Sequence, residues 1–74
     1  MQDGDYVHVT VNARAVGPGR IVDASRDPVQ VIVARPQRGP YQFAASRTFF
    51  VATASGRWTI DMPAQTLHEF FPDE

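Results

Sequence analysis

The chain of 74 residues has no cysteine and no lysine, and Leu67 is its single leucine. Without cysteine the protein cannot form a disulfide framework, a thiolate zinc site or a cysteine nucleophile. No apolar run approaches the length that would span a membrane, and the first residues do not open a signal peptide. From these absences we expect a cytoplasmic protein that does not contact a membrane.

The abundant residues favour strands over helices. Valine occurs 9 times, threonine 5 times and isoleucine 3 times. These β-branched residues suit strands, whereas leucine, which helices commonly use, is almost absent. A chain of this length has room for one hydrophobic core. We therefore expect one all-β domain that spans residues 1–74.

Charges of opposite sign are separated along the chain, although the net charge is only −1. Residues 12–60 contain all 7 basic residues, each an arginine, but only two acidic ones, Asp23 and Asp27. The other acidic residues lie before and after this region. The basic middle predicts either a surface that attracts an anionic partner or a surface that the acidic ends neutralise.

Hydrophobic alternation and turn residues divide the chain into short strands. Residues 5–11 alternate strictly, with three valines on one face of the expected strand. The glycines and proline within residues 12–19 predict a long loop. The main strands are expected at residues 5–11, 20–24, 29–34, 48–53 and 57–62, with an edge strand at 41–44, a helical turn at 63–67 and a closing strand at 68–71.

Five short strands and a single helical turn before the last strand predict a small closed barrel. Closure would pair the edge strands that a sheet of this size otherwise exposes. Four segments carry a likeness to known proteins: Gly-Asp-Tyr-Val-His-Val at 4–9, Gly-Pro-Gly-Arg-Ile-Val at 17–22, and residues 29–33 and 60–67. In these segments the chain resembles the SH3-like barrels, particularly the bacterial KOW- and Tudor-like group. The resemblance implies a five-stranded SH3-like barrel and a role in transcription- or nucleic-acid-associated regulation.

Residues that could carry catalysis do not form a recognisable motif. A hydrolytic serine needs a base that a third group orients, yet Ser25, Ser46 and Ser55 all fall in expected turns or loops, where hydroxyls commonly bond to the backbone. His8 and His68 lack the spacing of metal ligands. We expect no enzyme activity, no cofactor and no metal site.

Arginines alternate with aromatic residues between positions 35 and 47. Arg35, Arg38 and Arg47 flank Tyr41 and Phe43, and prolines restrict the backbone of this segment. Guanidinium groups and aromatic rings together are typical of protein interfaces and of sites that bind single-stranded nucleic acid. We take these five residues as the candidate binding site. The alternative is that the two rings pack on the barrel while the arginines are merely solvated.

The composition thus favours a non-enzymatic binding module whose partner is another protein or a second copy of the chain. The adjacent pair Phe49 and Phe50 supports self-association, because a strand must send one of the two rings outward. A KOW- or Tudor-like nucleic-acid-binding module is the second hypothesis, and a small oligomeric enzyme with an active site between subunits is the third. Trp58 is expected in the core.

Overall fold

The computed structural model of the protein describes residues 1–35, 38–63 and 70. Within these residues the regular secondary structure is strand apart from one 3₁₀ turn and Phe70, which confirms the all-β prediction. The elements follow one another as β1 (Tyr6–Val11), β2 (Arg14–Asp23), β3 (Val29–Arg35), β4 (Gly39–Ala45), the 3₁₀ turn η1 (Arg47–Phe49), β5 (Phe50–Ala52) and β6 (Trp58–Met62).

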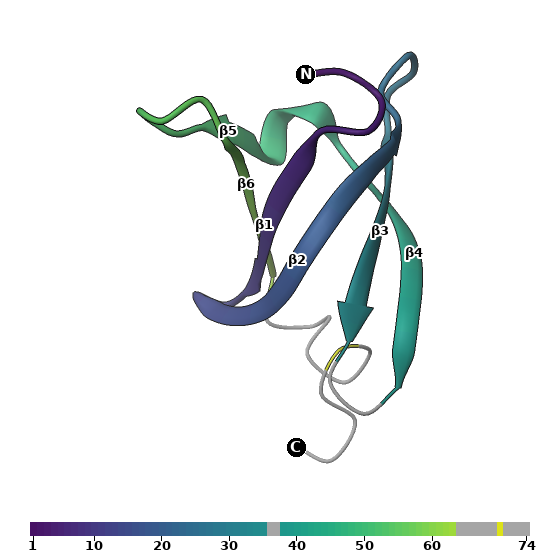
Figure 1. Ribbon diagram of the computed structural model, residues 1–74, viewed down its shortest axis with the longest axis vertical. Helices are drawn as coiled ribbons and strands as arrows, with labels where there is room; N and C mark the ends of the chain where they lie inside the picture. The colour runs from purple at the N-terminus through teal and green to yellow at the C-terminus, as the bar shows by residue number, and fades with distance from the viewer. Residues whose placement is uncertain (36–37, 64–69, 71–74) are drawn as a thin grey trace.

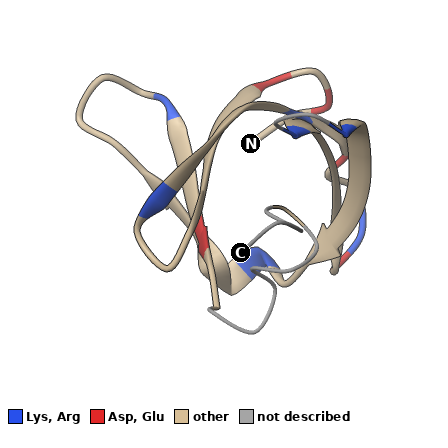
Figure 2. Ribbon diagram, turned by 90° about the horizontal axis from the view of Figure 1, so that it is seen from below, with Lys and Arg blue, Asp and Glu red and all other residues tan. Residues whose placement is uncertain are grey.

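The described strands form one mixed sheet in the order β4-β3-β2-β1-β6-β5 (Figure 1). Neighbouring strands are antiparallel except for β1 and β6, which pair in parallel from Val7 with Trp58 to Val11 with Met62. Seen from below, the sheet curls around a central space (Figure 2). Its inner face therefore becomes the core and its outer face remains in contact with solvent.

The core follows the two-residue alternation of the strands. Inward-facing side chains from all six described strands and Phe70 are buried in one cluster, and no polar or charged side chain is buried in the described part of the chain. The buried side chains include Val7, Val9 and Val11 of β1, Val29, Val31 and Val33 of β3, and Ile60 and Met62 of β6. The alternation in residues 5–11 thus predicted the inner face of β1 correctly.

Residues 12–19 were expected to form a loop, and that prediction is wrong. β1 and β2 are joined by a two-residue turn at Asn12 and Ala13, whose φ angles are 52° and 65°. Positive φ at both central residues is the geometry that lets a short turn match the twist of a hairpin. Gly17 and Gly19 then lie inside β2, where both pair with β1 and Gly19 also pairs with β3.

The closed five-stranded barrel is also wrong, because the sheet has six strands and stays open. β4 and β5 lie at opposite ends of the strand order, and η1 carries the chain from one to the other. Phe70 packs against the rings of Tyr41 and Phe43, so its side chain covers this part of the inner face of β4. Phe70 is helical, not part of a strand. The rest of the expected closing strand, and the helical turn beyond Pro63, lie outside the described residues.

One carboxylate holds the β1–β2 turn in place. Asp61 Oδ1 accepts hydrogen bonds from Thr10 Oγ1 at 2.6 Å and from the backbone N–H of Ala13 at 2.9 Å. The second bond fixes a residue whose left-handed backbone conformation is unfavourable for alanine. The two bonds, that from Thr10 first, lower the pKa of Asp61 below its ordinary value of 3.8.

Asp61→Asn is expected to lower the melting temperature more at about pH 7 than at about pH 2, because only the wild-type carboxylate titrates. Since the pKa in the folded state lies below 3.8, these bonds stabilise the fold above that pH and lose their effect as the pH falls through the folded pKa. Thermal melts across this range measure the difference between variant and wild type. Thr59→Val is the control, because its hydroxyl donates to the Val51 carbonyl oxygen, which does not titrate. A difference that does not change with pH would contradict the role of Asp61.

Candidate functional site

Of the five predicted site residues, the structure places Arg35 against Tyr41, and Tyr41 against the ring of Phe43. The Arg35 guanidinium carbon lies 4.7 Å from the centroid of the Tyr41 ring, and Arg35 Nε donates to the Gly39 carbonyl oxygen at 3.3 Å. Arg35 ends β3 and Tyr41 lies in β4, and the antiparallel pairing of these strands, from Val33 with Tyr41 to Arg35 with Gly39, brings the cation over the ring. Arg38, just before β4, is exposed.

Phe43 lies in the core, not on the surface. Its side chain is 9% exposed, and its ring contacts those of Tyr41 and Phe70 at centroid distances of 6.1 and 5.7 Å. Tyr41 is partly buried against the same cluster. For Phe43 the structure therefore agrees with the alternative, in which the ring packs inside the fold.

Arg47 lies beyond the other end of β4, in η1. Its backbone N–H donates to Asp27 Oδ1 at 2.9 Å, and its guanidinium Nη2 donates to the carbonyl oxygen of Ala24. These bonds tie η1 to the turn that follows β2. Arg47 thus has a structural function in this place and does not lie beside Arg35 and Tyr41.

The serines that the sequence raised as nucleophile candidates make short-range hydrogen bonds. Ser25 Oγ donates to Asp23 Oδ1 at 2.6 Å, Ser46 Oγ accepts from the Thr48 backbone N–H at 3.4 Å, and the Ser55 hydroxyl lies 3.0 Å from that of Thr53. Each partner is two residues away, as in turns that side chains stabilise. The bonds from Ser25 lower the pKa of Asp23.

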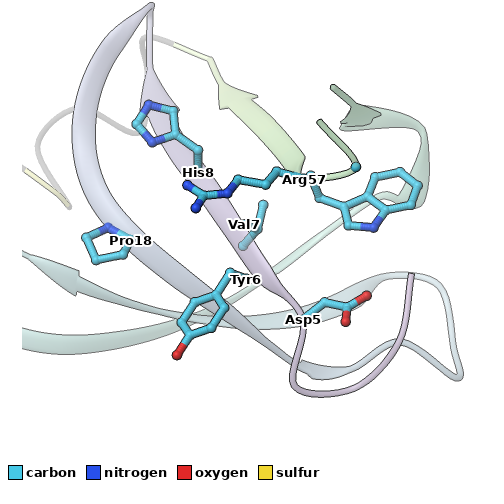
Figure 3. Close-up of a pocket in the computed structure, with 8 residues that line it drawn as sticks. Asp5, Tyr6, Val7, His8, Pro18 and Arg57 are labelled. Carbon is cyan, nitrogen blue, oxygen red and sulfur yellow. The ribbon is translucent and has the colours of Figure 1, made fainter. Parts of the chain in front are cut away.

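Sequence reasoning did not single out the outer face of the sheet, which carries two hollows. The first has a volume of about 420 Å³ and lies where the outer face of β1 meets the start of β6. Its walls include Tyr6, His8, Pro18, Arg57 and Trp58 (Figure 3). Trp58 was expected in the core; it packs against the buried cluster but is itself only partly buried, and it also lines this hollow.

The second hollow has a volume of about 280 Å³ and lies across β2 and β3. Gly19, Ile32 and Pro40 line it, together with Tyr6 and Pro18, which also line the first hollow. Because the two hollows share these walls, they adjoin. We call them together the outer groove.

Cross-strand pairs of β1 and β2 place the side chains between the two hollows. Tyr6 pairs with Arg20 and His8 pairs with Pro18, so all four side chains project from the outer face. Arg20 stacks on Tyr6 with its guanidinium carbon 4.7 Å from the ring centroid, and its Nη2 donates to Tyr6 Oη. The ring is therefore held in position although Tyr6 is 61% exposed.

The signal for this surface was present in the sequence but incomplete. Strict alternation already put Tyr6 and His8 on the face opposite the valines. What alternation could not show was the register, which brings Pro18 and Arg20 beside them, or the parallel pairing, which brings Arg57 from the far end of the chain.

Comparison with family models, with curated proteins and with solved structures found no match to this chain. Within the described residues, no helix is long and apolar enough to cross a membrane. No group of three or more acidic or histidine side chains that could hold a metal ion occurs among those residues either. His68 lies outside them.

Proposed function

We propose that the protein is a non-enzymatic binding module and that its outer groove binds a peptide segment of a partner protein. The observation that carries this proposal is that the two hollows adjoin: they share Tyr6 and Pro18 and together cross the sheet from β6 to β4. A peptide several residues long needs such an elongated surface, whereas a compact ligand needs one enclosed cavity.

The side chains of the groove support a protein partner. Tyrosine, tryptophan and arginine are the residues that most often dominate the energy of protein interfaces. The outer groove contains Tyr6, Trp58 and Arg57, and the stacking of Arg20 limits the motion that Tyr6 would lose on binding.

The other hypotheses rest on fewer observations. Stacking of Arg35 on Tyr41 favours a nucleic-acid module, but basic residues are spread around the ring of the sheet in Figure 2 and the net charge is −1. Self-association is supported by Phe49 and Val51, which are 49% and 61% exposed beside an edge of the sheet. An active site between subunits, a cytoplasmic location and the resemblance to KOW- and Tudor-like proteins stay predictions. The small, strongly curled β-sheet supports that resemblance.

Ile32→Glu is expected to abolish peptide binding without unfolding the protein. Ile32 is half-buried on the outer face of β3, so a carboxylate there would introduce a charge into the apolar second hollow. The experiment selects peptides from a displayed library of short random sequences on immobilised wild type, and then measures their affinity for each variant by fluorescence polarisation.

Val51→Glu is the matched control, because it places the same new charge on an exposed side chain of β5 that lines neither hollow. Circular dichroism melts verify that both variants fold. If no peptide is enriched on wild type, or if enriched peptides bind the folded Ile32→Glu variant as well as wild type, the outer groove is not the binding site.

A further inference from the structure

The positively charged side chain of Arg57 lies over the first hollow of the outer groove. In Figure 3 its side chain crosses Val7 and places the guanidinium between His8 and Tyr6. Among the described residues the Arg57 guanidinium has no hydrogen bond or ion pair. Only its backbone is bonded: the N–H donates to Thr53 Oγ1 at 3.1 Å, and the carbonyl oxygen accepts from the Thr53 backbone N–H at 2.7 Å. Its five N–H donors are therefore available to a ligand in the hollow.

The charges around this guanidinium favour an anion. Asp5 is the acidic residue that lines the groove, and its Oδ2 accepts a hydrogen bond from the Gln2 backbone N–H at 2.8 Å. No ion pair joins Asp5 to Arg57 within the described residues. Arg20 adds a second cation at the shared wall of the two hollows, so cations outnumber acids along the groove.

The second hollow has a different chemistry. Most of its walls are apolar and include the Ile32 side chain, the rings of Pro18 and Pro40, and the bare backbone of Gly19; Arg20 and Tyr6 line the side towards the first hollow. Such walls hold an apolar side chain and offer few partners to a polar one. Tyr6 separates this apolar hollow from the cationic one.

We propose that the occupant of the outer groove is an acidic peptide segment of a partner protein. A carboxylate of that segment binds the Arg57 guanidinium, and an apolar side chain nearby in the segment fills the hollow at Ile32. Arginine suits this task because its planar donors can bind both oxygens of a carboxylate. This inference rests on the proposed function and specifies the chemistry of the partner.

The test uses the same displayed library on wild type, on Arg57→Glu and on Arg26→Glu. Arg26 is exposed in the turn after β2 and lines neither hollow, so Arg26→Glu makes the same change of charge outside the groove. Wild type and Arg26→Glu should enrich peptides rich in aspartate and glutamate beside an apolar residue. Arg57→Glu should enrich peptides rich in lysine and arginine instead.

A double-mutant cycle then isolates the contact. With wild type, replacing the acidic residues of a selected peptide by their amides should weaken binding about tenfold, whereas with Arg57→Gln the same replacement should have almost no effect. The tenfold preference should decrease as salt is added, because the contact is partly exposed.

Two results would overturn the inference while leaving the proposed function intact. One is enrichment of peptides that depend on Ile32 but show no excess of acidic residues. The other is an equal effect of the amide replacement on wild type and Arg57→Gln. Failure to enrich any peptide would instead remove the proposed function itself. If a labelled single-stranded oligonucleotide displaces the selected peptides and binds more tightly than they do, the partner is a nucleic acid and the inference is wrong.

Discussion

Phe70→Ala is expected to destabilise the protein by about 3–5 kcal/mol, which is the usual cost of truncating a fully buried phenylalanine. The side chain of Phe70 is 0% exposed and is among the largest in the core. Its ring meets those of Tyr41 and Phe43 edge-on, at centroid distances of 5.4 and 5.7 Å. Alanine would remove both contacts and leave a cavity beside β4.

A loss of this size is a large part of the stability of any small domain, so the variant should be partly unfolded at ambient temperature. Urea titrations followed by Trp58 fluorescence measure the free energy of unfolding. Phe49→Ala is the control, since that ring is 49% exposed and its removal should have a small effect. Equal losses for the two variants would contradict the position of Phe70 in the core.

Gly19→Ala should be the second most damaging of the substitutions considered, at about 1–3 kcal/mol, because it overfills a packed site. A Cβ at Gly19 would lie 3.0 Å from Val9 Cγ2, 3.1 Å from Val7 Cγ1 and 3.3 Å from the Ile32 carbonyl oxygen. The neighbours on both adjacent strands would have to move, and the carbonyl belongs to backbone that strand pairing fixes.

The clash can be tested by relieving it. In Gly19→Ala combined with Val9→Ala, the nearest methyl group is gone, so the loss of stability should be smaller than the sum of the two single losses. Urea titrations of the four proteins complete this cycle. Strictly additive losses would show that the cost of Gly19→Ala arises elsewhere than at Val9.

Sequence patterns predicted the strands better than their connections. The alternation in residues 5–11 corresponds to β1, and the β-branched run at 29–34 corresponds to β3. Both strands could be predicted because their patterns depend only on the spacing of apolar residues within one segment. The turn at Asn12 and Ala13 was missed because alanine rarely adopts a positive φ. What makes it tolerable is the hydrogen bond that the Ala13 N–H donates to Asp61, a residue nearly fifty positions away, which no local pattern reveals.

The candidate site shows the same limit. Proximity in the sequence grouped Arg35, Tyr41 and Arg47, but β4 is an extended strand and separates the first two from the third. The side chains of the outer groove come from five strands and from the residues just before them. Their grouping depends on register and on the parallel pair, and both are set by the packing of the whole core.

The parallel pairing of β1 with β6 also determines the order in which this fold can be completed. β1 to β4 are consecutive antiparallel neighbours, and their contacts close short loops. The pairing of Val7 with Trp58 closes a much longer one, and contacts of this kind slow folding. On the ribosome, β1 is synthesised before β6. One edge of β1 must therefore stay without its partner strand until β6 has emerged.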